Sequence, residues 1–136
     1  MSLFKVFDIA GSGMSAQSVR LNTTSSNLAN AQTTGKTPEE VYKARHPVFA
    51  AVMNEYSNQG SVGVKVKEIV ESNEEPQKLY QPGNPNANEE GYVFMSNVNM
   101  IEEMANMMSA SRSYQSNVEV MNTTKQLMLR TLQLGQ

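Results

Sequence analysis

Few side chains in this sequence could carry out chemistry, and none has the companions that a reactive site needs. His46 is the only histidine and cysteine is absent, so a histidine or cysteine metal site and a histidine-led catalytic triad both lack their parts. Paired carboxylates can act as acid and base, and the acidic pairs here are Glu74–Glu75, Glu89–Glu90 and Glu102–Glu103. Neighbouring side chains on a helix point about 100° apart, and the first two pairs lie beside loops. We therefore interpret all three pairs as solvated charges or helix caps.

A group of methionines offers one further kind of chemistry. Thioethers are soft ligands that suit Cu(I), and the sequence places Met100, Met104, Met107 and Met108 close together. Methionines at heptad spacing are more typical of a packed helix seam, which is the interpretation that we favour. The sequence therefore predicts no enzyme activity, no metal, no cofactor and no small-molecule substrate.

Length and charge limit the class of protein further. The 136 residues allow one ordinary domain. The formal net charge of -2 gives no basic surface for nucleic acid. No run approaches the roughly 18 apolar residues of a membrane-spanning helix. The first residues contain Lys5 and Asp8 within a short apolar stretch, so they do not predict a cleavable signal peptide.

The N-terminal segment has the heptad pattern of a helix that packs along one narrow seam. An apolar residue recurs every seventh position at Phe7, Met14, Leu21 and Leu28. The companion heptad positions are only partly apolar, and they hold Leu3, Ala10, Gln17, Thr24 and Ala31. This pattern predicts a helix of about 45 Å over residues 3–31, which Thr33-Thr34-Gly35 should end.

The C-terminal segment repeats this design more strongly. One seam position holds Met100, Met107, Tyr114, Met121 and Met128. The other seam position holds Met104, Val118 and Leu132, together with two polar residues. Asn99 is placed to cap the first turn, with Glu102 three residues later as in a capping box. We expect a continuous helix from about 99 to 133.

The residues between these helices have a different character. Val62, Val64 and Val66 alternate with polar residues or glycine, as in a strand. Further strands are expected at 47–49 and 92–95, a short helical turn at 37–40, and loops at 71–76 and 81–86. The predicted fold is mainly α, with long terminal helices paired as a coiled coil and a small β-containing insert. Its parts are residues 1–35, 36–96 and 97–136.

The N-terminal helix is unusually poor in charge. Arg20 is the only charged residue between Ala10 and Gly35, and serine, threonine and asparagine take the place of the usual charged surface. These residues are mediocre helix formers, so the isolated helix would be marginal in water. We infer that both ends are largely unfolded in the free monomer and become ordered on assembly. The alternative is a two-helix coiled coil with an ordinary polar face.

Several runs resemble the bacterial flagellar rod and hook axial proteins. The run Ser25–Ala31 is similar to the N-terminal signature of that family, and it includes Ser26, Asn27, Leu28, Ala29 and Asn30. A second run begins at Asn97 and continues through Asn99, Glu102 and Glu103 to Lys125. Together with the opening residues and the segment 81–93, these runs most narrowly resemble the C type of proximal-rod subunit. The chain departs from the family pattern over residues 33–40.

The resemblance implies a structural subunit of the flagellar basal-body rod. Such a subunit is exported without a cleaved signal through the flagellar type III apparatus and builds into the proximal rod in the periplasm. Its partners are copies of itself, other rod proteins, the export apparatus and the inner-membrane ring. The rod is the drive shaft that transmits torque from the motor to the hook, and the terminal helices form its inner tube.

Two competing interpretations remain open on the sequence. One is a soluble coiled-coil adaptor or an export chaperone of a secretion system. The other is a distal-rod or hook subunit, although those chains commonly carry larger middle domains than residues 36–96.

Overall fold

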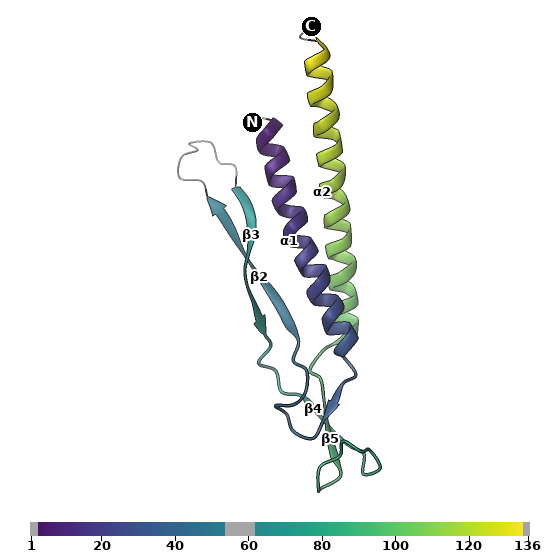
Figure 1. Ribbon diagram of the computed structural model, residues 1–136. Coiled ribbons are helices and arrows are strands. Elements are labelled where there is room, and N and C mark those ends of the chain that lie inside the picture. Colours follow the sequence, from purple (N-terminus) through teal and green to yellow (C-terminus); the bar gives the residue numbers. More distant parts are fainter. Residues whose placement is uncertain (1–2, 54–61, 135–136) are drawn as a thin grey trace.

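Two long antiparallel helices form the body of the molecule (Figure 1). The computed structural model describes residues 3–53 and 62–134. Helix α1 spans Leu3–Asn30 and helix α2 spans Met100–Leu134. The strands between them are β1 Thr34–Gly35, β2 Arg45–Met53, β3 Val62–Glu71, β4 Gln77–Tyr80 and β5 Tyr92–Met95. The two long helices with a β-containing middle, predicted from the sequence, are thus confirmed.

Small and polar residues form the closest contact between α1 and α2. The buried residues of α1 are Ala10, Ala16, Thr23, Thr24 and Asn27, and those of α2 are Glu103, Ala110 and Thr124. A Cβ added at Gly13 would lie 2.9 Å from Asn117 Nδ2, so the helices approach closely there. The fully buried positions therefore differ from the apolar heptad that the sequence emphasised, because close helix packing favours small side chains.

A long β-hairpin packs against α1 on the side away from α2 (Figure 1). Strands β2 and β3 are antiparallel, with a register that runs from Arg45 opposite Glu71 to Met53 opposite Val62. A register shift between Val48 and Phe49 marks a bulge. The strands expected from the alternating valines and at 47–49 are both confirmed within this hairpin, and both are longer than predicted.

A second, smaller sheet lies where α1 ends and α2 begins (Figure 1). Its strand order is β1-β5-β4, and both pairings are antiparallel. The strand expected at 92–95 is confirmed as β5. Strands β1 and β4 were not predicted, because β1 has two residues and β4 is exposed throughout without an alternating apolar pattern. Residues 37–40 form a hydrogen-bonded turn and not a helical segment.

The apolar core is small for a chain of this length. Ala31, Ala44 and Val98 form a buried cluster with Tyr42 packed against it. The solvent-accessible surface is 9625 Å², whereas a compact monomer of the same mass would expose about 7,000 Å². The difference of about 2,600 Å² is comparable to the area one protein contributes to three ordinary protein–protein interfaces.

Candidate functional site: an exposed assembly surface and a buried polar hub

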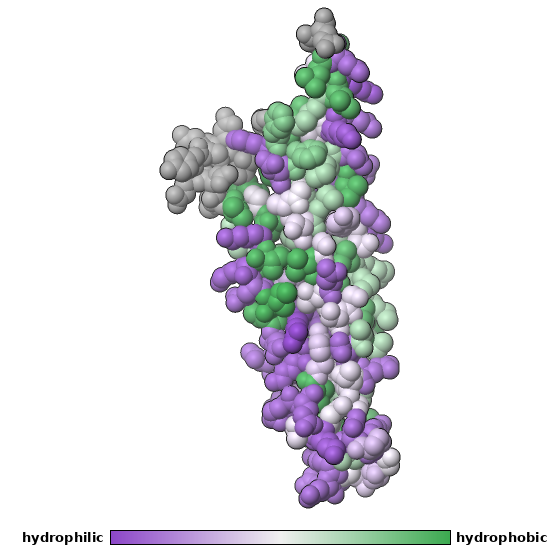
Figure 2. All heavy atoms as spheres, viewed as in Figure 1, coloured by the Kyte–Doolittle hydropathy of each residue, from purple (hydrophilic) through white to green (hydrophobic). Residues whose placement is uncertain are grey.

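Large apolar side chains lie exposed on both helices. Ile101 is 82% exposed and Phe4 is 73% exposed. Other exposed apolar residues of the helices are Phe7, Met100, Met104, Met108, Val120, Leu127, Leu129, Leu132 and Leu134. Figure 2 shows hydrophobic atoms on the surface over the upper part of the molecule, while its lower end is mostly hydrophilic. Exposed apolar area on this scale is typical of a surface that another protein covers.

The structure divides the predicted packing residues into two groups. Phe7, Met100, Met104 and Leu132 are exposed. Intermediate burial is found at Leu3, Met14, Leu21, Leu28, Met107, Tyr114, Val118, Met121 and Met128. Leu3, Met128 and Leu132 are brought together, with Phe4 and Thr131, around one apolar hollow of about 280 Å³. These residues flank the buried helix contact and reach the surface, so a neighbouring molecule can cover them.

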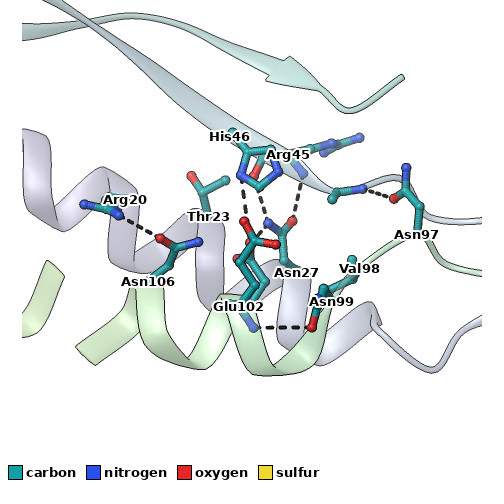
Figure 3. Close-up of polar contacts among 12 residues, drawn as sticks. Arg20, Thr23, Asn27, Arg45, His46, Asn97, Val98, Asn99, Glu102 and Asn106 are labelled. Carbon is teal, nitrogen blue, oxygen red and sulfur yellow. Dashed lines mark hydrogen bonds and ion pairs between the residues drawn. The ribbon is translucent and has the colours of Figure 1, made fainter. Parts of the chain in front are cut away.

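Asn27 is the centre of a buried polar hub that joins α1, α2 and the start of β2 (Figure 3). Its side chain is 0% exposed. Asn27 Nδ2 donates to the Arg45 carbonyl at 2.8 Å and to Glu103 Oε2 at 3.0 Å. Asn27 Oδ1 accepts from the Arg45 N–H at 3.0 Å and from the Tyr42 hydroxyl at 2.8 Å. The amide therefore uses both donors and both acceptor positions.

Glu103 is the carboxylate of this hub, and it is 3% exposed. Besides its bond from Asn27, its Oε1 lies 3.9 Å from His46 Nδ1. Burial raises the pKa of Tyr42, and the Arg45 charge opposes that effect. The Arg45 side chain lies over the Tyr42 ring, with its guanidinium carbon 5.5 Å from the ring centroid, and it pairs with Glu71 at 2.9 Å. In the hub, the Tyr42 hydroxyl and the Arg45 N–H thus donate to Asn27, and Asn27 in turn donates to the Glu103 carboxylate.

Two further asparagines fix the segment that leads into α2. Asn97 Oδ1 accepts from the Ala44 N–H at 2.7 Å, and Asn97 Nδ2 donates to the Glu74 carbonyl at 2.8 Å. Asn97 therefore ties the residues before β2 to those after β3. Asn99 Oδ1 accepts from the N–H groups of Ile101 and Glu102 at 3.1 Å and 3.3 Å, which is the N-cap expected from the sequence.

The other motif residues have local roles. Ser26 is exposed, and its carbonyl accepts from Asn30 Nδ2 at 2.8 Å. Ala29 is exposed and Leu28 is half-buried. Glu102 is exposed at the start of α2. These side chains do not join the hub.

Sequence reasoning missed several members of the hub. Tyr42 and Arg45 lie in a segment without periodicity, and the role of Arg45 is played by its backbone, which leaves no sequence signal. Arg20 Nη2 donates to Asn106 Oδ1 at 2.8 Å, a cross-helix contact that a single charge in a polar helix could have suggested.

Among residues 3–53 and 62–134, no group of three or more histidine, aspartate and glutamate side chains is placed to hold a metal ion. No described helix is long and apolar enough to cross a membrane.

Comparison with known proteins gives a consistent family. A family model described as "Flagella basal body rod protein" matches residues 7–35. A second model, "Flagellar basal body rod FlgEFG protein C-terminal", matches residues 89–134. These two matches cover most of α1 and all of α2, the helices that carry the exposed apolar surface.

Full-length relatives agree with these matches. The flagellar basal-body rod protein FlgC of Escherichia coli O6:H1 is 50% identical over 136 residues, which is 100% of both chains. FlgC of Salmonella typhimurium is 49% identical over the same length. FlgC of Aquifex aeolicus is 40% identical over 135 residues, covering 98% of this chain and 97% of that one. The chain therefore belongs to the FlgC family of flagellar basal-body rod proteins.

Proposed function

We propose that this chain is a structural subunit of the proximal rod in the bacterial flagellar basal body. One observation carries the proposal beyond family membership. Large apolar side chains are exposed at the N-terminal end of α1 and along α2, and the molecule has about 2,600 Å² more surface than a compact chain of its size. A monomer in water gains nothing from such a surface, whereas a subunit in a tube is covered by neighbours on several sides.

In this arrangement, residues 1–35 and 97–136 form the axial core, and residues 36–96 face outwards or towards neighbouring subunits. The antiparallel contact between α1 and α2 supports coiled-coil pairing of the terminal helices within each subunit. The exposed residues Ile101, Met104 and Met108 lie on the opposite side of α2 from the buried residue Ala110, so they are available to other subunits. Many shallow apolar contacts of this kind give a rod the stiffness to transmit torque to the hook.

The proposed partners are copies of this chain, other rod proteins, the export apparatus and the inner-membrane ring. We propose that the chain leaves the cytoplasm unfolded and without a cleaved signal peptide. The small core supports this route, because a chain whose buried apolar residues are mostly alanine and valine resists unfolding weakly. The proposed role is structural.

Circular dichroism and hydrogen exchange on the purified chain test this role. A rod subunit should show helix content well below that of its assembled state and rapid exchange over 3–30 and 100–134. A coiled-coil adaptor or export chaperone should be fully helical and protected as a monomer. A stable, protected helical monomer would therefore favour the adaptor and oppose the rod proposal.

A further inference from the structure

The Asn27 hub joins three segments that are far apart in the sequence, and each bond depends on the orientation of one amide. Asn27 Nδ2 can donate to Glu103 only when its oxygen faces the opposite way, towards Tyr42 and the Arg45 N–H. Docking of the β2 segment therefore orients the Asn27 side-chain N–H towards Glu103 of α2. Conversely, burial of the Glu103 carboxylate requires that donor, because an unpaired buried charge is strongly unfavourable.

We propose that Asn27 couples pairing of α1 with α2 to docking of β2, so that the three segments become ordered together. The amide is the only neutral side chain of this size with two donors and two acceptor positions. Aspartate in its place would set a second carboxylate against Glu103 and leave the Arg45 carbonyl without a donor. Alanine would leave Glu103 buried without its Asn27 donor.

The hairpin contact extends along α1 well beyond the hub. At the far end of the hairpin, the Val64 N–H donates to Ser12 Oγ at 3.2 Å. Ser12 and Asn27 are separated by about 22 Å along the helix axis. Helix α1 thus binds the backbone of the hairpin at two places. Ser12 contacts the beginning of β3 and Asn27 contacts the beginning of β2, and these lie at opposite ends of the hairpin. A substitution at the hub is therefore expected to change the contact between α1 and the far end of the hairpin.

Two cysteine pairs can serve as reporters, because the chain has no cysteine of its own. A Cβ at Gly63 would lie 3.7 Å from Ser12 Cβ, within the usual range for a disulfide. The pair Ser12→Cys with Gly63→Cys therefore reports docking of the hairpin. A Cβ at Gly13 would lie 3.3 Å from Asn117 Cγ, so the pair Gly13→Cys with Asn117→Cys reports pairing of the helices.

Equilibrium thiol–disulfide exchange of each full-length reporter chain against glutathione tests the coupling. The method gives an effective concentration for each pair even when the ordered state is a minor population. Asn27→Ala should lower both effective concentrations by about tenfold. The matched control is Asn30→Ala, one turn along α1, whose side chain bonds only within its own helix and which should leave both values unchanged.

The decisive variant is Tyr42→Phe, which removes a hydroxyl that contacts Asn27 and not α2. Coupling predicts a fall of about threefold to tenfold in the helix reporter as well as in the hairpin reporter. A helix reporter that stays at its original value would overturn the proposal, because β2 would then dock independently of helix pairing.

A rescue experiment separates loss of hydrogen bonding from general failure to fold. Asn27→Asp should lower both reporters at least as much as Asn27→Ala, because it opposes two carboxylates. Adding Glu103→Gln supplies an amide donor to the new carboxylate and removes the repulsion between the two carboxylates. The effective concentrations of both reporter pairs should therefore return most of the way to their original values. No recovery in the double variant would contradict the assigned geometry.

Discussion

Gly13 of α1 lies directly against the side chain of Asn117 in α2. A Cβ at Gly13 would stand 2.9 Å from Asn117 Nδ2, closer than such atoms approach in folded proteins. The contact lies between the polar hub at one end of the helix pair and the apolar hollow at the other. It sets how closely the two helices can approach in the middle of their length.

This contact predicts opposite outcomes for two glycines in the same helix. Gly11→Ala should stabilise the helix by about 1 kcal/mol, because the new Cβ would make an ordinary van der Waals contact with the end of the Met121 side chain. Gly13→Ala gains the same helix propensity but must displace Asn117, so the net benefit should vanish or reverse. Thermal dissociation of rods in purified hook–basal bodies measures both effects. Adding Asn117→Ala should restore the benefit at Gly13, and equal stabilisation by both single variants would contradict the close contact.

A charge on the exposed surface should block assembly without unfolding the chain. Ile101 is 82% exposed, so Ile101→Asp removes few contacts within the monomer. In the rod it would bury an unpaired carboxylate at a subunit contact, at a cost of several kcal/mol. Swimming motility and the amount of the chain in hook–basal bodies should fall sharply.

Ser116→Asp provides the matched control for that surface. It adds the same charge at another exposed position of α2, which lies about 60–120° around the helix from Ile101, Met104 and Met108. Normal export of both variants, with loss of incorporation only for Ile101→Asp, is the expected result. Full motility of the Ile101 variant would show that this part of α2 is not covered in the rod.

A charge placed beside the contact between α1 and α2 should destabilise the folded subunit. Leu28 and Met121 are half-buried, and Leu28→Asp or Met121→Asp should destabilise the folded subunit by about 3 kcal/mol. Incorporation into basal bodies should fail while export continues. Met121→Leu conserves volume and should be tolerated. Motile cells with the aspartate variants would place these side chains outside the packed contact.

Alkaline pH should loosen the hub through Tyr42. Burial raises the pKa of Tyr42 above its ordinary value of 10.0, so the neutral hydroxyl is favoured in the folded chain. Its contribution is fully present below about pH 10 and is lost as the pH rises through the raised pKa. Retention of the chain in basal bodies, measured across that range, should fall more steeply for the natural chain than for Tyr42→Phe. Identical pH profiles for the two chains would contradict this role of the hydroxyl.

The sequence predicted the elements better than it predicted their contacts. Heptad spacing and the cap at Asn99 located both helices, and alternating valines located the hairpin, because these patterns depend on local geometry. The contact between the helices was harder to foresee. Threonine, alanine and glycine allow close approach, but they give a weak periodic signal beside Met and Leu, which instead flank the contact or face outwards.

The contacts of the Asn27 hub also could not be predicted from the sequence. Asn27 was recognised only as part of a motif, and nothing near it in the sequence predicts a bond to the backbone of Arg45. Burial of Glu103 could not be anticipated either, because a glutamate in the first turn of a helix is usually a solvated charge. Such contacts depend on tertiary arrangement and on backbone groups that every residue shares.

Quantitative mass spectrometry of hook–basal bodies purified from the source bacterium tests the central claim most directly. The account predicts peptides of this chain at a stoichiometry comparable to that of the other rod proteins in the same particles. Absence of the chain from these particles, with the protein abundant in the cytosol, would contradict a structural role in the rod and favour an adaptor.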